Sequence, residues 1–328
     1  MKIQLPIRRA MIVAALGSAA AFGFGAQALA ADYPSQPINL VVPYAAGGGA
    51  DNAARIIAKG MSEITGQSII IDNKSGASGA IGAAYVAHAA PNGYTVLFDA
   101  SAFTINPALR KLPYDIRKDF IPVSQAISVP NILVVAKDSP YNTVQDFVAA
   151  AKAKPNGYSF ASYGPGSLAQ MAGELLKKDA GLDIVHVPYK GGATAIVDVM
   201  SGQVQIYFAN AASSIAYITS KQLKALAVTS KTRMPELPGV PTMEESGLKG
   251  FEVLEWNGFF MPKGTPQEAV DKLQSIVQAA LARPDVRESL GKLGLTPVGS
   301  ASKDFAAFVD TEARRWEEVV KSNHIVMN

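Results

Sequence analysis

Apolar residues are distributed along the chain in two alternating patterns. Short and almost continuously apolar runs, such as those at 38–44 and 94–100, stand between longer stretches in which apolar residues recur every three or four positions. The short runs predict buried strands, and the longer stretches predict amphipathic helices. Because strands and helices follow each other in turn, we predict an α/β fold in which mostly parallel sheets are flanked by helices.

The same alternation starts again in the middle of the chain. An apolar run at 131–140 opens a second series of strands and helices, which continues to about residue 230. The proline-rich stretch at 231–247 predicts a loop, 252–262 predicts one more long strand, and mainly helices are expected after Thr265. Two series of this kind indicate two lobes, because a chain of this length usually divides into two.

The lobe boundaries follow from the points where the chain crosses between the two series. We place one crossing near residues 129–133 and the other near 254–258. The first lobe then comprises residues 32–130 together with 256–328, and the second lobe comprises residues 131–255. Loops at the carboxyl ends of the strands would face each other across a cleft, where we expect the ligand to bind.

The first thirty residues have the pattern of an export signal. Lys2, Arg8 and Arg9 precede an apolar run, and Ala28-Leu29-Ala30 fits a cleavage site between small residues. The apolar run is short for a membrane span of ~20 residues, which favours cleavage over a permanent anchor. We therefore predict that residues 1–30 are a signal peptide cleaved near Ala30, and that the remaining chain is exported.

Charge and cysteine content exclude several classes of function. The whole chain has 30 basic and 27 acidic residues, and the signal removes three basic and no acidic residues, so that the rest is balanced. Balanced charge gives no electrostatic reason to expect nucleic acid or an anionic membrane as partner. The sequence contains no cysteine, which excludes thiol nucleophiles, disulfides and cysteine-based zinc sites.

Glycines gather where predicted strands pass into helices. Gly47-Gly48-Gly49 follow the first strand, and Gly164-Pro165-Gly166-Ser167 stand at a later junction; "VPYKGGATA" at 187–195 echoes "VPYAAGGGA" at 42–50. A helix that begins at such a junction offers unpaired N–H groups and its positive dipole end to an anion. One junction alone could serve only tight packing, but three favour binding. Two loops from opposite lobes could clamp a carboxylate without an arginine.

Motifs for nucleotides, metals and catalysis are missing from the sequence. Asn52 stands where a G-x-G-x-x-G motif that starts at Gly47 requires its third glycine. His88, His186 and His324 lack the spacing of a metal site, and none belongs to a serine-hydrolase motif. We therefore expect no catalytic residue, no cofactor and no metal, and we favour a binding protein over an exported hydrolase.

Six segments in a fixed order carry a resemblance to a known family. They are "YPSQPINLVVPYAAGGGADNAAR", "GASGAIGAAYVAHAAPNGYTVLF", "INPALRKLPYDIRKDFIPVS", "IVHVPYKGGATAIVDVMSGQVQ", "LKALAVTS" and "LPGVPTMEESG". From Tyr33 onward the chain resembles the solute receptors of tripartite tricarboxylate transporters, the Bug or TctC family. The resemblance implies a periplasmic binding protein of type II, with two α/β lobes that close around a small carboxylated solute.

The resemblance also implies which residues bind the solute. In this family the first β–α loop and a facing loop of the second lobe hold one carboxylate, largely through backbone N–H groups and ordered water. Carried over to this chain, the expected ligand-binding residues are Tyr44, Ala45, Ala46, Gly47, Gly48, Gly49, Ser101, Ser162, Tyr163, Gly164, Ser167 and Asn210.

Partners and ligand class follow from the same resemblance. We expect a small mono-, di- or tricarboxylate, aromatic acids included, a membrane permease with one large and one small subunit, and a monomeric receptor. Many relatives carry Asp at the position of Ala209 and often His at the position of Gln170. The missing Asp argues against a solute with an ammonium group. A sensor that presents its ligand to a signalling partner is an alternative role.

Overall fold

The computed structural model describes residues 33–322 and 325. The predicted signal peptide at 1–30 and its cleavage site near Ala30 lie outside these residues. Across 33–322 and 325, none of the helices is both long enough and apolar enough to span a membrane.

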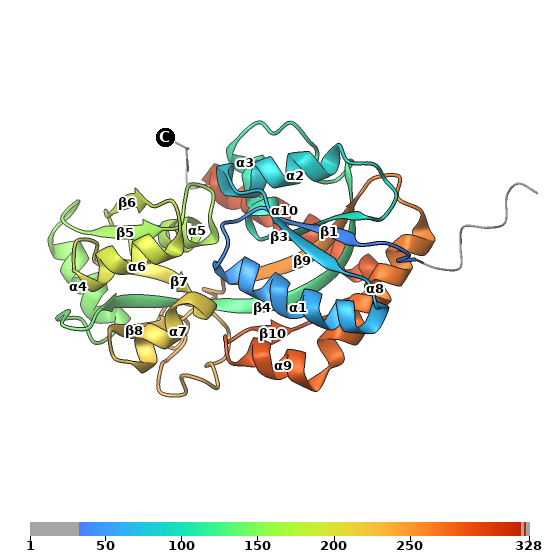
Figure 1. Ribbon diagram of the computed structural model, residues 1–328. Helices are drawn as coiled ribbons and strands as arrows, with labels where there is room; N and C mark the ends of the chain where they lie inside the picture. Colours follow the sequence, from blue (N-terminus) through green and yellow to red (C-terminus); the bar gives the residue numbers. More distant parts are fainter. Residues whose placement is uncertain (1–32, 323–324, 326–328) are drawn as a thin grey trace, which may run out of the picture.

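Two lobes lie side by side in Figure 1, and each contains three parallel strands. The first lobe orders them β2-β1-β3, and the second orders them β6-β5-β7. Their bounds are Ile38–Val42 for β1, Ile69–Asn73 for β2, Thr95–Ala100 for β3, Ser159–Ser162 for β5, Val185–Pro188 for β6 and Ile206–Asn210 for β7. The predicted two-lobed α/β fold is confirmed.

Two antiparallel strands, β4 (Phe120–Ala136) and β9 (Leu254–Pro262), tie the lobes together. Residues 120–130 of β4 pair with β9, which in turn pairs with β3 of the first lobe. Residues 131–136 of β4 pair with β7 on one side and with β8 (Leu223–Val228) on the other. The chain therefore changes lobe within β4, which supports the lobe limits that we propose.

β4 is longer than the strand that the sequence indicated. The predicted strand began with the apolar run at residue 131, and the preceding Pro122 and Pro130 are residues that a central strand usually excludes. The structure starts the strand at Phe120 and shifts its register against β9 directly after Pro122, whereas Pro130 stands where β4 leaves β9. A register irregularity of this kind lets a strand contain a proline. The short β10 (Thr296–Pro297) also pairs with β4.

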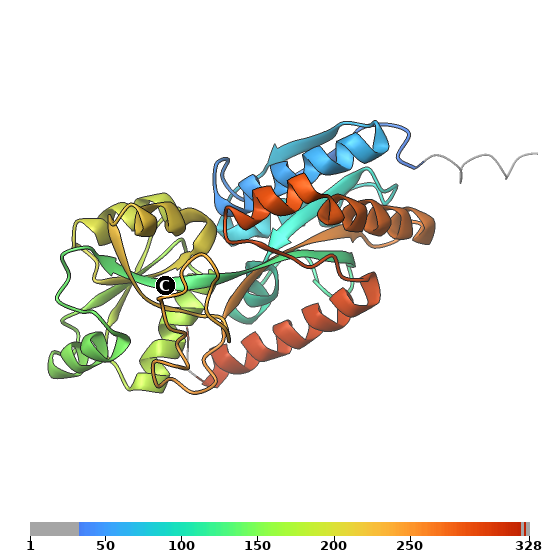
Figure 2. The same ribbon diagram turned by 90° about the horizontal axis from the view of Figure 1, so that it is seen from below.

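Helices cover both faces of the first-lobe sheet. α1, α8 and α9 lie on one face, and α2, α3 and α10 lie on the other (Figure 2). Alternate residues of β1 face the two sides of the sheet, since Leu40 and Val42 belong to the core that includes residues of α1 and α8, while Val41 belongs to the core that includes residues of α2, α3 and α10. The helix bounds are Gly49–Thr65 for α1, Ala80–Ala87 for α2, Ala102–Leu109 for α3, Val144–Ala153 for α4, Leu168–Ala180 for α5, Gly192–Met200 for α6, Ala211–Thr219 for α7, Gln267–Ala282 for α8, Pro284–Gly291 for α9 and Ser302–Ser322 for α10.

Gly82 allows α2 to pack directly on the end of β1. A Cβ at this position would lie 2.6 Å from Cβ of Pro43 and 3.1 Å from the carbonyl oxygen of Lys74. The second of these contacts is with backbone, which cannot rotate away. We expect Gly82→Ala to lower the free energy of unfolding by about 1–3 kcal/mol, as overpacking does.

Gly291→Ala on α9 is the matched control. No atom lies within 4 Å of a Cβ at Gly291, so this change should stabilise the chain by about 0.4–1 kcal/mol. Urea denaturation of both variants measures the two effects. Equal effects of the two substitutions would contradict the close packing of α2 against Pro43.

Candidate functional site

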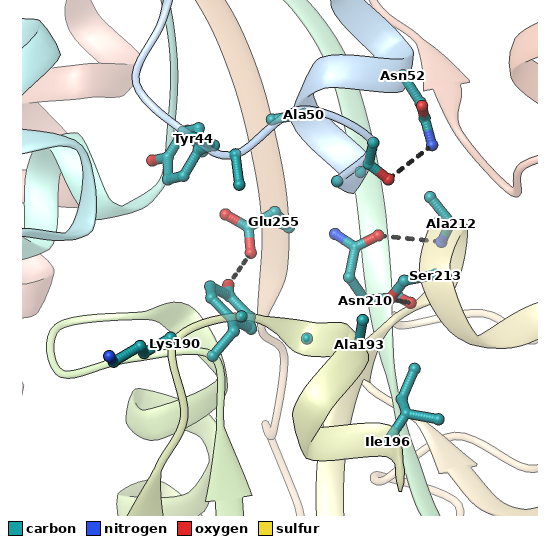
Figure 3. Close-up of a pocket in the computed structure, with 18 of the residues that line it drawn as sticks. Tyr44, Ala50, Asn52, Lys190, Ala193, Ile196, Asn210, Ala212, Ser213 and Glu255 are labelled. Atoms are coloured by element: carbon teal, nitrogen blue, oxygen red, sulfur yellow. Dashed lines mark hydrogen bonds between the residues drawn. The ribbon is translucent and has the colours of Figure 1, made fainter. Parts of the chain in front are cut away.

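A cavity of about 370 Å³ lies between the lobes. This volume lies within the range of sites that enclose small molecules. We call it the interlobe cavity; its wall is formed by residues of segments 44–50, 190–193 and 210–213 together with Tyr163, Tyr207 and Glu255 (Figure 3). Both lobes and β9 therefore contribute to one site.

The loop between β1 and α1 forms the first-lobe wall of the cavity, and Asp51 braces it. The Asp51 carboxylate accepts hydrogen bonds from the Gly47 N–H at 2.8 Å, from Arg55 Nε at 2.8 Å and from Asn73 Nδ2 at 2.9 Å. Burial raises the pKa of Asp51, but these three hydrogen bonds outweigh burial and leave the pKa below its ordinary value. Asp51 is thus a structural anion that fixes the loop.

The braced loop leaves the start of α1 open toward the cavity. Gly47 donates its N–H to Asp51, and Gly48 donates its own to the carbonyl of Ala45 at 3.3 Å. The N–H groups of Gly49 and Ala50 have no partner among the described residues, and Gly48 offers no side chain to cap them. An anion at this point would meet two free donors and the positive end of the helix dipole.

The second lobe presents two more helix N-termini. α6 begins after Gly191, and within the described part of the chain its first N–H groups, at Gly192 and Ala193, are likewise uncapped. α7 begins after Asn210, whose Oδ1 accepts the N–H of Ala212 at 3.0 Å. A Cβ on Gly49 would lie 3.4 Å from Asn210 Oδ1, so the two lobes nearly touch here. Three helix N-termini therefore converge on the cavity.

The inner part of the site contains two buried carboxyl groups, each bonded to a tyrosine. Tyr163 donates its hydroxyl proton to Glu255, which is 5% exposed and lines the cavity. Tyr44 donates to Asp99 Oδ1 at 2.8 Å, and the Ala100 N–H donates to the same oxygen at 2.7 Å. Neither carboxyl group has an ion-pair partner among the residues that the structure describes.

Burial dominates the ionisation of this group of side chains. Burial and, to a smaller extent, the nearby Glu255 raise the pKa of Asp99 to about 7, against the hydrogen bonds from Ala100 and Tyr44. Burial also raises the pKa of Glu255, while hydrogen bonds from Tyr163 and Ser101 oppose the increase. Both tyrosines have pKa values well above 10 for the same reason, so they act as proton donors in these hydrogen bonds.

The structure brings seven of the twelve predicted ligand-binding residues to the cavity. These are Tyr44, Ala45, Gly47, Gly48, Gly49, Tyr163 and Asn210. The other five do not line it: Ala46 is exposed to solvent, and the remaining four, which are buried or turned toward other partners, are Ser101, Ser162, Gly164 and Ser167.

The loop at 164–167 contacts the first lobe instead of the cavity. Ser78 and Arg110 of the first lobe donate hydrogen bonds to the carbonyl of Pro165, the latter at 3.2 Å. The Ser167 hydroxyl caps α5 by accepting the N–H of Gln170 at 3.4 Å, so the start of this helix is already satisfied. The glycine junction that faces Gly49 across the cavity is therefore the one at 190–193.

The sequence analysis counted the junction at 190–193 among the three that favour binding, but it named none of these residues as ligand-binding. The only signal was the echo between "VPYKGGATA" and "VPYAAGGGA", and the structure places both junctions at one cavity. Glu255 and Tyr207 were not assigned to the site either. The sequence indicates a role for Glu255 only weakly, because all that it shows is an acidic residue in a mostly apolar strand at a lobe crossing.

The structure also brings together a serine and a histidine that the sequence left unconnected. Ser162 Oγ lies 2.7 Å from His186 Nε2, and burial lowers the pKa of His186 to about 4. Ser162 is fully buried and does not line the interlobe cavity. His88 bonds the carbonyl of Ala84, and His324 lies outside the described residues. Within the described part, no group of three His, Asp or Glu residues could hold a metal ion.

Comparison with known proteins shows which family and which individual proteins this chain is similar to. A family model described as "Tripartite tricarboxylate transporter family receptor" matches residues 53–325. The chain is 40% identical over 290 residues to a Pseudomonas sp. (strain P51) protein from the tcbD-tcbE intergenic region, covering 88% of this chain and 86% of that protein.

Two solved structures with bound ligands are also similar. Rpa4515 of R. palustris with adipate is 36% identical, has a TM-score of 0.86, and is matched over 90% of this chain and 99% of that one. MatC of Rhodopseudomonas palustris with bound malate is 34% identical, has a TM-score of 0.80, and is matched over 88% and 99%.

The raised pKa of Asp99 predicts a specific pH dependence of stability. The carboxyl ionises near pH 3.8 in the unfolded chain but stays protonated to about pH 7 in the folded chain. Between these two pH values the folded chain binds one proton more than the unfolded chain does. The contribution of Asp99 to the free energy of unfolding therefore falls as the pH rises. The free energy of unfolding of Asp99→Asn, relative to that of wild type, should therefore increase by up to about 1.4 kcal/mol per pH unit between pH 4 and pH 7. Above pH 7 this difference should stay constant.

Urea denaturation at several pH values measures this difference. Asp138→Asn is the control for loss of a carboxylate, because its side chain is 86% exposed and remote from the site. Parallel curves for wild type and Asp99→Asn between pH 4 and pH 7 would show that Asp99 ionises normally.

Proposed function

This chain belongs to the tripartite tricarboxylate transporter receptor family, and from this premise we propose that it captures a small carboxylate between its lobes. The observation that carries the proposal is the convergence of uncapped helix N-termini from both lobes on one cavity. Each supplies free N–H groups and a positive dipole end, and no arginine is required.

Closure of the lobes is the proposed binding mechanism. One carboxylate would accept hydrogen bonds from Gly49 and Ala50 of the first lobe and from Gly192 and Ala193 of the second. Because no single lobe holds all four donors, the ligand has its full affinity only for the closed form. It therefore shifts the population toward closure. The contacts of the 164–167 loop with the first lobe would form in the same closed state.

The ligands of the similar structures support a carboxylate as the solute. Adipate and malate are both small carboxylates, and both proteins share the fold of this chain over almost its whole length. The proposed class comprises mono-, di- and tricarboxylates, aromatic acids included. We further propose that the receptor is a periplasmic monomer that delivers its solute to a two-subunit membrane permease.

Binding without catalysis fits the geometry better than a hydrolase. Ser162 and His186 form the pairing that a hydrolase would need, but a nucleophile must reach its substrate. Ser162 Oγ instead lies within 3.2 Å of the backbone N–H and carbonyl of Gly164, in a buried place that does not open into the cavity. The hydrogen bond between Ser162 and His186 instead stabilises the end of β5 against β6.

A ligand panel tests the proposed class. The purified chain, unfolded and refolded to remove carried-over ligand, should be stabilised by at least one small carboxylate and not by the corresponding amide. A ligand at 100 times its Kd adds about 2.7 kcal/mol, which raises Tm by several degrees. Stabilisation by neutral or cationic compounds alone would overturn the proposal.

A negative charge introduced at the start of α6 tests the binding geometry. Ala193→Asp would place a carboxylate beside that of the solute, whereas Ala193→Asn adds a group of the same size without the charge. At an effective dielectric of 20, two charges ~4 Å apart repel by about 4 kcal/mol, so the Asp variant should bind at least about 100-fold more weakly. Equal Kd values for the two variants in calorimetry would place the carboxylate elsewhere.

A further inference from the structure

Glu255 is an acidic side chain in a cavity that we propose to bind an anion. Among the described residues that line the cavity, the only basic one is Lys190. Lys190 is exposed, and its side chain extends away from Glu255 in Figure 3. The Glu255 carboxyl therefore has no cation beside it in the described part of the protein.

The surroundings of Glu255 consist of hydroxyl groups on one side and open cavity on the other. Tyr163 donates to Oε2 of Glu255, and Ser101 lies within hydrogen-bonding reach. Ser101 is itself fixed, because its Oγ accepts the N–H of Trp256 at 3.1 Å. A carboxylate has about four acceptor sites, so these donors leave room for a further donor from the cavity.

Tyr207 is a further polar residue at the cavity, and its hydroxyl group has no hydrogen-bond partner among the described residues. The hydroxyl is completely buried. A Cβ on Gly192 would lie 3.1 Å from this hydroxyl, which places it at the start of α6. Buried polar groups are normally satisfied, so an unpartnered hydroxyl beside the cavity wall favours a polar ligand.

The balance of charge in the cavity indicates which charged groups the ligand carries. The solute carboxylate and Glu255 would share one small cavity, and two buried negative charges without a cation are strongly unfavourable. The starts of α1 and α6 can hold the solute carboxylate, but no cation in the described wall pairs with Glu255. A positive group on the solute itself would neutralise it and would also use the free acceptor sites of Glu255 and Tyr207.

We propose that Glu255 determines specificity, and that the cavity takes an amino acid whose ammonium group binds Glu255 while its carboxylate binds the starts of α1 and α6. This inference rests on the proposed function and narrows its solute class. It reverses the expectation drawn from Ala209. Ala209 is fully buried in β7 and does not line the cavity, so the missing Asp at that position says nothing about the ligand.

Five-carbon acids that differ in one group provide the test. Calorimetry on the refolded chain compares pentanoate, 2-aminopentanoate, 5-aminopentanoate, 5-hydroxypentanoate and glutarate, and is repeated with the four- and six-carbon sets. At least one amino acid should bind at least about tenfold more tightly than the matched unsubstituted acid. The dicarboxylates should bind most weakly, because their second carboxylate would meet Glu255.

Two variants separate a specific role of Glu255 from a structural one. Glu255→Gln keeps an acceptor for Tyr163 but removes the charge, so amino acid binding should weaken at least about 30-fold, as for loss of a buried charge partner. The unsubstituted acid and glutarate should both bind more tightly, because the variant removes a negative charge from the cavity that holds their carboxylates. Glu252→Gln, which removes an acid that pairs with Lys231 outside the cavity, should behave as wild type.

The outcomes distinguish this inference from the proposed function. If the unsubstituted acids or dicarboxylates bind most tightly to wild type, or if Glu255→Gln leaves the ranking unchanged, the inference is overturned while a carboxylate receptor still stands. If no acid of any set binds to wild type or variant, both the inference and the proposed function fail.

Discussion

The antiparallel pairing of β4 with β9 is the constraint on which the rest of the site depends. β4 gives its first part to the first-lobe sheet and its last part to the second-lobe sheet, so one continuous backbone fixes the position of both sheets. The loops that precede α1 and α6 therefore face each other across a single cavity. Glu255 lies at the start of β9, beside the same crossing, and so it reaches the cavity from the connection between the lobes.

The electrostatics of the cavity separate into two regions. Backbone N–H groups and helix dipoles make the wall at α1 and α6 favourable for an anion, although neither wall contains an arginine. Asp51 could have cancelled this effect, but its carboxylate is paired with Arg55 and accepts hydrogen bonds from Gly47 and Asn73. The inner wall has the opposite character, because the carboxyl of Glu255 lies there and accepts a hydrogen bond from Tyr163. An elongated solute with unlike ends fits this division better than a symmetrical one.

Glycine has different uses at junctions that look alike in the sequence. At Gly48 and Gly191 it leaves a helix start without a side-chain cap, and free N–H groups result. At Gly166 the N–H is taken by Gln170, and the neighbouring carbonyl of Pro165 is held by the first lobe. The first use leaves donors free for a ligand, whereas at the second the donor is satisfied within its own lobe and the neighbouring carbonyl accepts a hydrogen bond from the other lobe. Local sequence does not separate the two, since both depend on which partner the fold brings near.

The sequence by itself determined the α/β fold, the two lobes and the presence of glycine junctions, because strand and helix periodicity and turn chemistry are local properties. Seven of the residues that the family resemblance implied also line the cavity, most of them in the first β–α loop. Only the tertiary structure decided that 190–193 rather than 164–167 faces that loop, that Ser162 meets His186, and that Glu255 enters the cavity without a cation. These facts depend on strand order and on the packing of residues that are distant in sequence, and a local pattern contains no information about either.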